Sequence, residues 1–257
     1  MSRSIQAVKA ETLDEQLSEL PSGLSFFDSI LRHEAKEALE AEGEVFISQN
    51  PKGEKTGLFI YDNYETTGTI FTKSRDVFDQ FYALKPSSYI FSELEAAEYE
   101  KEVWNIWQMD VARASPAHRF RHHVSIDSNA DEIERFMTST QPGTNKRWVR
   151  VALENGDKCF VVRIANKIVG LAWLTVVGEV ARSHSIYVEP QFRRIGVMTD
   201  NFQARLMYLK SRRVRTLINE IAESNLPSSR HVEKIGEKIV GKLFLYWNPD
   251  SNIREES

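Results

Sequence analysis

The apolar and polar positions between residues 119 and 247 predict a regular order of strands and helices. Three consecutive apolar runs joined by short turns predict an antiparallel meander, at 159–165, 168–177 and 181–188. A strand at 120–126 and two helical stretches, at 127–137 and 147–155, precede this meander. After it the pattern predicts a helix, a strand, a short helix and a last strand, at 199–213, 214–222, 227–235 and 241–247.

The first part of the chain also alternates between strand-like and helix-like stretches. Helical spacing of apolar residues predicts helices at 25–42 and at 75–86. Short runs rich in β-branched and aromatic residues predict strands at 45–49, 57–62, 68–74 and 87–93. A long helix is expected over 93–114, where Trp104 and Trp107 stand three positions apart and would share one face.

The stretch ASPAHRF at 114–120 is the candidate linker between two domains. We therefore expect an N-terminal domain at 1–115 and a second domain at 116–257. The order of elements in the second domain favours a mixed α/β (α+β) fold, in which helices flank a mostly antiparallel sheet, over a doubly wound parallel sheet. The N-terminal domain is expected to be a smaller α/β domain.

Charge and composition narrow the class of protein. The formal net charge is −4, but residues 1–115 carry 21 acids and 11 bases, whereas residues 116–257 carry 16 acids and 22 bases. The second part should therefore favour an anionic partner. Cys159 is the single cysteine and lies in an apolar run, so it is expected in the core, and a cysteine metal cluster is excluded. No signal sequence is evident, and the longest apolar run, at 168–178, is too short to span a bilayer, so we expect a cytoplasmic protein without a membrane partner.

The stretch VEPQFRRIGVM at 188–198 joins the last meander strand to the long helix. A turn of this kind exposes the first amide groups of the helix, which form a natural anion site. Gly196 removes a Cβ where the backbone must approach a bulky anion, and Arg193 and Arg194 add positive potential. The spacing matches neither a Walker loop nor a dinucleotide fingerprint. The alternative is an ordinary turn with solvated arginines.

This loop resembles motif A of the GNAT superfamily of acyl-CoA-dependent N-acetyltransferases. That motif has a strand ending in valine and then x-Pro-x-aromatic-Arg-x-x-Gly-x-Gly/Ala. The matching residues here are Val188, Pro190, Phe192, Arg193 and Gly196. Met198 departs from the motif, because the family has a small residue at this position.

A second stretch, NLPSSRHVEKIGE, is similar to the later motif of the same family. Asn225, Ser228, Lys234 and Gly236 fall at the expected intervals. Two positions depart from it, with Val232 at the usual tyrosine and Glu237 at the usual phenylalanine. The resemblance covers roughly residues 119–247. The layout of the first half is similar to that of tandem two-domain GNAT proteins such as the glycine N-acyltransferases, in which a degenerate copy precedes the catalytic one.

The resemblance implies that acetyl-CoA is the cosubstrate and that it lies against the strand before the loop. The amides and carbonyls near Ile186, Tyr187 and Val188 would hold the pantetheine arm, and the Val188 amide would stabilise the oxyanion. The full set of implied cofactor-binding residues is Ile186, Tyr187, Val188, Arg193, Arg194, Ile195, Gly196, Val197, Met198, Thr199, Asn225 and Ser228. No metal is expected.

His184 is the candidate general base, because serotonin N-acetyltransferases carry a functional histidine at that relative place. A histidine titrates near neutral pH, which suits proton removal from an ammonium group. Glu179 and Glu220 are the rival bases. Strand alternation would put His184 and Val188 on one face of the sheet, unless a bulge shifts the parity. Val232 cannot protonate the departing thiolate. Water could do so instead, and Tyr187 and Tyr208 are the other candidate donors.

The sequence therefore favours an acetyltransferase that transfers the acyl group to a primary amine by direct attack in a ternary complex. The acceptor would be a small-molecule or peptide amine. A non-catalytic acyl-CoA-binding regulatory module is the alternative, since Met198 and Val232 depart from the motifs. Nucleic acid is not expected as a partner, because the basic stretch at 209–215 runs from a helix end into a strand. The sequence does not decide between a monomer and a homodimer. His33, His118 and His231 are expected at the surface or in the linker.

Overall fold

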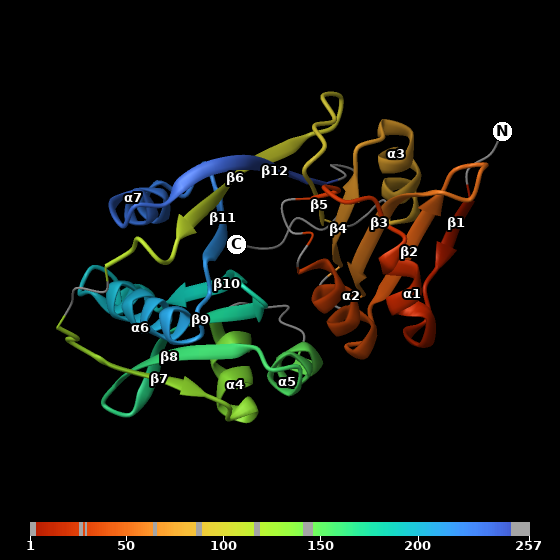
Figure 1. Ribbon diagram of the computed structural model, residues 1–257. Coiled ribbons are helices and arrows are strands. Elements are labelled where there is room, and N and C mark those ends of the chain that lie inside the picture. The colour runs from red at the N-terminus through yellow and green to blue at the C-terminus, as the bar shows by residue number, and fades with distance from the viewer. Residues whose placement is uncertain are drawn as a thin grey trace. The chain divides into compact units, whose positions relative to one another are not determined.

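The computed structural model (Figure 1) describes residues 4–247, except 26, 27, 29, 64, 65, 86–88, 116–118 and 141–145. These residues form two compact units. The first unit is drawn from residues 1–105, 222–224 and 241–257, and the second from 106–221 and 225–240. The second unit thus begins before the linker expected at 114–120. A domain boundary between residues 115 and 116, in the sense of independent folding, stays a prediction.

The first unit alternates strands and helices in a definite order. Its elements are β1 (Ser4–Ala7), α1 (Leu13–Ser18), α2 (Leu31–Glu40), β2 (Glu44–Gln49), β3 (Lys55–Asp62), β4 (Thr67–Thr72), α3 (Arg75–Leu84) and β5 (Tyr89–Ser92). The strands β1 to β4 pair with their neighbours antiparallel, whereas β4 and β5 are parallel. Phe78 and Phe81 of α3 pack against Phe59 and Ile70 of the sheet, which gives this unit its own apolar core.

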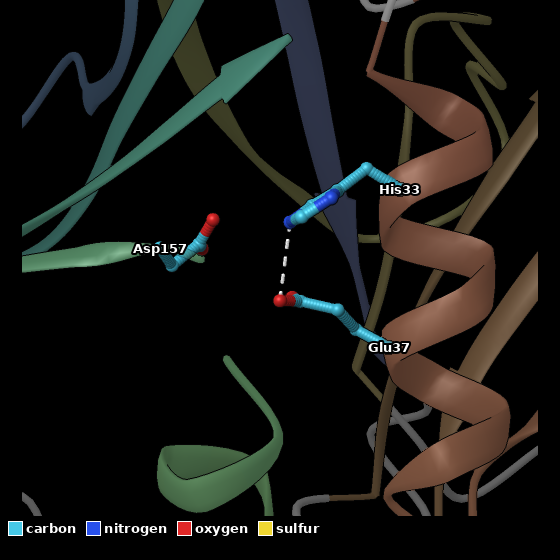
Figure 2. A group of neighbouring side chains, drawn as sticks. All are labelled: His33, Glu37 and Asp157. Atoms are coloured by element: carbon cyan, nitrogen blue, oxygen red, sulfur yellow. Dashed lines mark ion pairs between the residues drawn. The ribbon is translucent and has the colours of Figure 1, made fainter. Parts of the chain in front are cut away.

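Helix α2 carries an ion pair between two side chains one turn apart, His33 and the buried Glu37. The Nε2 atom of His33 lies 3.1 Å from a carboxylate oxygen of Glu37, as Figure 2 shows. An i,i+4 pair of this kind supports the helix. The third side chain drawn there, Asp157, belongs to the second unit.

The second unit repeats this order of elements. It contains β7 (His123–Asp127), α4 (Ala130–Thr140), α5 (Lys146–Glu154), β8 (Lys158–Ile164), β9 (Lys167–Val177), β10 (Val180–Val188), α6 (Val197–Ser211), β11 (Thr216–Ala222), α7 (Leu226–Lys234) and the start of β12 (Lys238–Tyr246). The strands β7 to β10 are antiparallel, and β10 and β11 are parallel. Both units therefore show strand, two helices, three-strand meander, helix and parallel strand. This order confirms the expected mixed, mostly antiparallel fold.

Two apolar layers cover the sheet of the second unit. On one face, Phe202 and Leu206 of α6 pack on Leu174, Ala181 and Leu217. On the other face, α4 and α5 cover the sheet through residues that include Ile133 and Val149. Cys159 is buried in this second layer, as expected, and its burial raises the pKa of the thiol. A thiol in this environment is not a nucleophile.

The helix expected over 93–114 is wrong. Residues Lys101–Asp110 form strand β6, which lies next to β11. On a strand, residues three apart point to opposite faces, so Trp104 and Trp107 do not share a stripe. Trp104 contacts Phe91 in the first unit, whereas Trp107 packs in the second. Pairing with strands distant in sequence overrides the local helical spacing here.

Candidate functional site

The sheet of the second unit opens along one edge of β10. Strand β10 stays paired with β9 but its register shifts between His184 and Tyr187, where Ser185 has a positive φ of 47°. Its parallel pairing with β11 runs only from Val180 to Ser183 among the described residues. Such a bulge bends a strand and ends pairing. The backbone after Ser183 therefore faces a gap in the sheet and is available to a ligand.

The bulge also changes which side chains share a face. Ser183 faces α6, because its hydroxyl accepts a hydrogen bond from Arg205 of that helix. His184 lies on the other face, where its ring contacts Trp148 of α5. Val188 packs with Val197 on the α6 face. His184 and Val188 thus lie on opposite faces, contrary to simple alternation, because the extra residue shifts the parity.

The amide of Val188 points into this gap. The amide of Glu189 donates to Val169 of β9 at 2.9 Å, and adjacent residues of a strand point their amides to alternate sides. The Val188 amide therefore points away from β9. Its carbonyl accepts a bond of 3.0 Å from Nε of Arg193, on the same side. This orientation supports the expected role of the Val188 amide as an oxyanion donor.

The loop after β10 forms a concave turn that ends in the N-terminus of α6. Residues Pro190–Phe192 form a single 3-10 turn, and Arg194 and Gly196 have positive φ values of 67° and 98°. Gly196 is the N-cap of the helix, and the first intrahelical bond runs from the Asp200 amide to its carbonyl. The amides of the first helical turn have no partner within the helix. The turn therefore presents amide groups to an anion without an intervening Cβ.

A carboxylate that the sequence did not single out braces this turn. Asp200 is fully buried in the first turn of α6 and accepts bonds from the backbone amides of Arg121 and His122, at 3.0 and 2.9 Å. The His122 ring lies 2.8 Å from the same oxygen. This anchoring fixes the backbone of Arg121 beside the loop. The Arg121 side chain lies close to Gly196, since a Cβ built on that glycine would lie 3.8 Å from the Nη1 atom of Arg121. Arg121 thus adds a cation to the anion site.

The expected cofactor-binding residues differ in whether a side chain or only the backbone is available to a ligand. The side chain of Val197 is buried in the core, so only its backbone remains available, whereas Ile195 is exposed. The Arg193 guanidinium folds back over the Tyr187 ring, 5.7 Å from its centroid. The side chain of Asn225 caps α7 by accepting from the Ser228 amide at 3.3 Å. No described contact tests cofactor binding by Ile186, Arg194, Thr199 or Ser228, which stay predictions.

The Met198 side chain lies back along the helix rather than over the loop. Its sulfur is 3.9 Å from Nη2 of Arg205, two turns further on. The substitution Met198→Gly is expected to leave CoA affinity equal or tighter, because the turn gains room and loses no group that faces the anion. Titration calorimetry with CoA measures this.

The matched control is Met207→Gly, at an exposed position of the same helix. Both variants place a glycine in the helix, which lowers its stability by about 0.5–1 kcal/mol compared with an alanine at the same position. An affinity loss above about tenfold, roughly 1.4 kcal/mol, in Met198→Gly alone would show that the methionine contacts the ligand.

His184 sits in a small polar cluster on the α5 face. The hydroxyl of Thr175 donates to Asp157 at 2.6 Å and lies 3.1 Å from Nε2 of His184. Because that hydroxyl has one proton, it accepts from Nε2–H, and the lone pair of the neutral ring is on Nδ1. Nδ1 lies 3.3 Å from the hydroxyl of Ser185, at the bulge. Asp157 and Thr175 are buried residues that sequence patterns did not reveal, since neither lies in a motif.

The rival bases lie in different places. Glu179 is in the turn before β10 and pairs with Arg215 at 3.1 Å, with both side chains exposed. It stands nine residues before Val188, which is about 30 Å along an extended strand. This position does not favour catalysis at the gap. Glu220 is close to the gap on β11, but Arg182 holds its carboxylate at 2.9 Å. His184 is thus the best placed of the three candidate bases.

A second polar cluster is buried on the α6 face, just where pairing between β10 and β11 ends. Asn219 donates to both carboxylate oxygens of Glu237, at 2.9 and 2.8 Å. Burial raises the pKa of Glu237 from 4.5 to about 7, and burial lowers the pKa of Arg205 to about 10. His231, expected at the surface, is half-buried against Phe202, and its burial lowers its pKa. The departure at Glu237 therefore replaces an apolar contact with a buried carboxyl group.

The substitution Glu237→Gln is expected to stabilise the protein above neutral pH. The folded pKa of Glu237 lies above its unfolded value, so the cost of its charge is absent below about pH 4.5 and complete above about pH 7. A difference of about 2.5 pKa units corresponds to about 3 kcal/mol. Urea unfolding at pH 5 and pH 8 measures the free energy of unfolding. Glu233→Gln, at an exposed position of α7, is the control and should change little.

The comparison with protein families decides the assignment. The family model of the acetyltransferase (GNAT) family matches residues 118–249, which is slightly more than half of the chain. The chain belongs to the GNAT acetyltransferase family. This confirms the predicted resemblance of the second half. GNAT acetyltransferases use acetyl-CoA as cosubstrate, and the amide-lined turn at Gly196 and the open strand edge of this member suit such a molecule.

Solved structures share the fold of nearly the whole chain. A tandem GNAT protein from the clavulanic acid biosynthesis pathway is 12% identical, with a TM-score of 0.64 over 95% of this chain and 98% of that one. A GCN5-related N-acetyltransferase from Sphaerobacter thermophilus is also 12% identical, with a TM-score of 0.63 over 95% and 94%. A Drosophila protein is 9% identical, with a TM-score of 0.68 over 97% and 100%. These identities show the fold alone. No curated protein sequence matches the chain.

The structure of this GNAT protein also bears on the expectation about membranes. None of the described helices combines the length and the apolar character that a bilayer crossing needs.

Proposed function

We propose that this GNAT protein transfers an acetyl or acyl group from acyl-CoA to a primary amine by direct attack in a ternary complex. The observation that carries the proposal is the continuity of the open edge of β10 with the amide-lined turn at Gly196. The turn suits the pyrophosphate of CoA, and the open edge suits the amide groups of its pantetheine arm. The acceptor is a small-molecule or peptide amine.

Two groups of the chain are assigned to the chemical step, one for the oxyanion and one for the proton of the amine. The Val188 amide stabilises the negative charge that develops on the thioester oxygen. His184, on the α5 face, removes a proton from the substrate ammonium group through the lone pair of Nδ1, and the neutral amine then attacks. Asp157 and Thr175 hold the ring and stabilise its protonated form, since Nε2 lies 3.8 Å from the Asp157 carboxylate. Acetyl transfer to an amine needs a hydrogen-bond donor for the oxyanion and a base for the amine, and the proposal assigns these two roles to Val188 and His184.

The test is a screen of primary amines with acetyl-CoA, in which release of the CoA thiol is followed over time. Steady thiol release that depends on the amine supports the proposal. A protein that is stabilised by CoA but turns over with no amine would instead be a non-catalytic acyl-CoA-binding regulatory module. Val232, which has no acidic hydrogen, keeps that second function open. The cytoplasmic location, the independence from membrane and nucleic acid, and the choice between monomer and homodimer stay predictions.

A further inference from the structure

Trp107 is a buried hydrogen-bond donor with no acceptor among the described residues. It lies on β6, is 6% exposed, and packs against Ile221 of β11 and Val232 of α7. Its indole N–H makes no hydrogen bond within the described chain. A buried tryptophan usually finds a partner for this group. A buried donor without a partner destabilises the fold, so the indole N–H points to a partner that the described residues do not supply.

The surroundings of Trp107 locate that partner at the gap in the sheet. Ile221 is two residues beyond Asn219, the last residue of β11 that pairs with β10. It therefore borders the open stretch. Ile221 and Asn219 share a face by alternation, and this face is covered by α7. Trp107, Ile221 and Val232 form a buried apolar cluster, to which Trp107 also contributes the polar indole N–H.

The two faces of the gap are chemically different. The turn that suits the CoA phosphates begins α6, so the pantetheine arm enters from the face that α6 and α7 cover. His184 lies on the opposite face, from which the amine attacks. The group that leaves the thioester therefore departs on the side where Trp107 lies. The hydrogen-bond acceptor of the thioester on that side is its sulfur.

We propose that Trp107 donates its indole hydrogen bond to the sulfur of the bound acyl-CoA and stabilises the departing thiolate. This inference rests on the proposed function. The amine nitrogen bonds to the thioester carbon, the carbon–sulfur bond breaks, and its electron pair stays on sulfur. The indole hydrogen remains on nitrogen and stabilises that charge as a charge-assisted hydrogen bond. The proton that leaves the amine reaches the thiolate through His184 and solvent. Trp107 thus provides a donor beside Val232, which has none.

The test measures the ionisation of the thiol of CoA bound to the full-length protein and needs no acceptor amine. The absorbance of the thiolate is followed against pH, and the affinity for CoA is measured by calorimetry at a pH where the thiol is protonated. Trp107→Phe keeps an apolar ring and removes the donor. We expect this change to raise the pKa of the bound thiol by about one unit, a tenfold change in its ionisation constant, and to leave the affinity for the protonated form within about twofold.

A second variant guards against loss of the fold. Benzothienylalanine at position 107 keeps the shape of the indole and replaces only the N–H group, and it should reproduce the shift. The matched control is Trp104→Phe on the same strand, where the indole donates to Glu102 at 3.1 Å. It should leave the thiol pKa unchanged.

Two results would overturn the proposal in different ways. An unchanged thiol pKa in both Trp107 variants, with CoA still bound, rules out the indole–sulfur contact and leaves the proposed function standing. Failure of the wild-type protein to bind CoA at all removes the proposed function itself.

Discussion

Replacing Gly196 by glutamate is expected to abolish the rise in melting temperature that CoA produces in the wild-type protein. Gly196 has a φ of 98°, which L side chains rarely adopt, and it caps the helix at the anion site. The new side chain would lie beside Arg121, with its Cβ 3.6 Å from the Cδ atom, and its carboxylate would occupy the turn. A ligand that binds only the folded state raises stability by mass action, about 2.7 kcal/mol at a hundredfold excess over Kd. Thermal scans with and without CoA measure this rise.

The control must separate backbone strain from loss of the anion site. Gly156 has the same φ of 98° and lies in a turn of the same unit, where a Cβ would meet no atom within 4 Å. Gly156→Glu therefore introduces the same strain and the same charge away from the loop. It should lower the melting temperature without CoA but preserve the rise on adding CoA. A rise that survives in Gly196→Glu would place the nucleotide elsewhere on the protein.

Replacing His184 by alanine is expected to lower kcat/KM about 10²–10⁴-fold, the usual contribution of a general base, with little change in CoA affinity. The reason is geometric, since the ring lies on the face opposite the phosphate turn and contacts Thr175, Ser185 and Trp148 rather than the loop. The limb of the pH–rate profile that reports ionisation of the base should disappear. Steady-state kinetics with an amine identified by the screen measures both effects.

Two further variants sharpen this result. His123→Ala removes an exposed imidazole of β7 and should leave the kinetics unchanged. Asp157→Asn should lower kcat while leaving KM for the amine nearly constant, because Asp157 acts through the ring and not on the substrate. Full activity of His184→Ala, with an unaltered pH profile, would assign the imidazole a structural role and direct the search to Glu220 and solvent.

The loop after β10 shows how much of the site was predictable. Gly196, the paired arginines and the strand-to-helix change stand within eleven residues of sequence. Local backbone preferences decide such a turn, so the sequence predicted both the loop and the helix that follows. Asn225 was likewise recognisable three residues before Ser228, although its side chain serves as a helix cap.

The face assignments were not predictable, because one inserted residue reverses them. The bulge at Ser185 puts His184 and Val188 on opposite sides of the sheet, and no local pattern marks its position. The prediction of a helix over 93–114 was wrong for a related reason. The spacing of Trp104 and Trp107 fits a helical stripe, but pairing of β6 beside β11 stabilises a strand and sends the two indoles to different units.

The sequence by itself determined the order of elements in the second unit, the anion-binding turn and the membership of the family, since each depends on residues close together in the chain. The tertiary structure alone decided which groups meet. Asp200 braces Arg121 from a distance of 79 residues, Thr175 joins Asp157 to His184, and Trp107 reaches Val232 from a distant strand. Such contacts follow from strand pairing and helix packing, and these depend on the energy of the whole fold rather than on any local pattern.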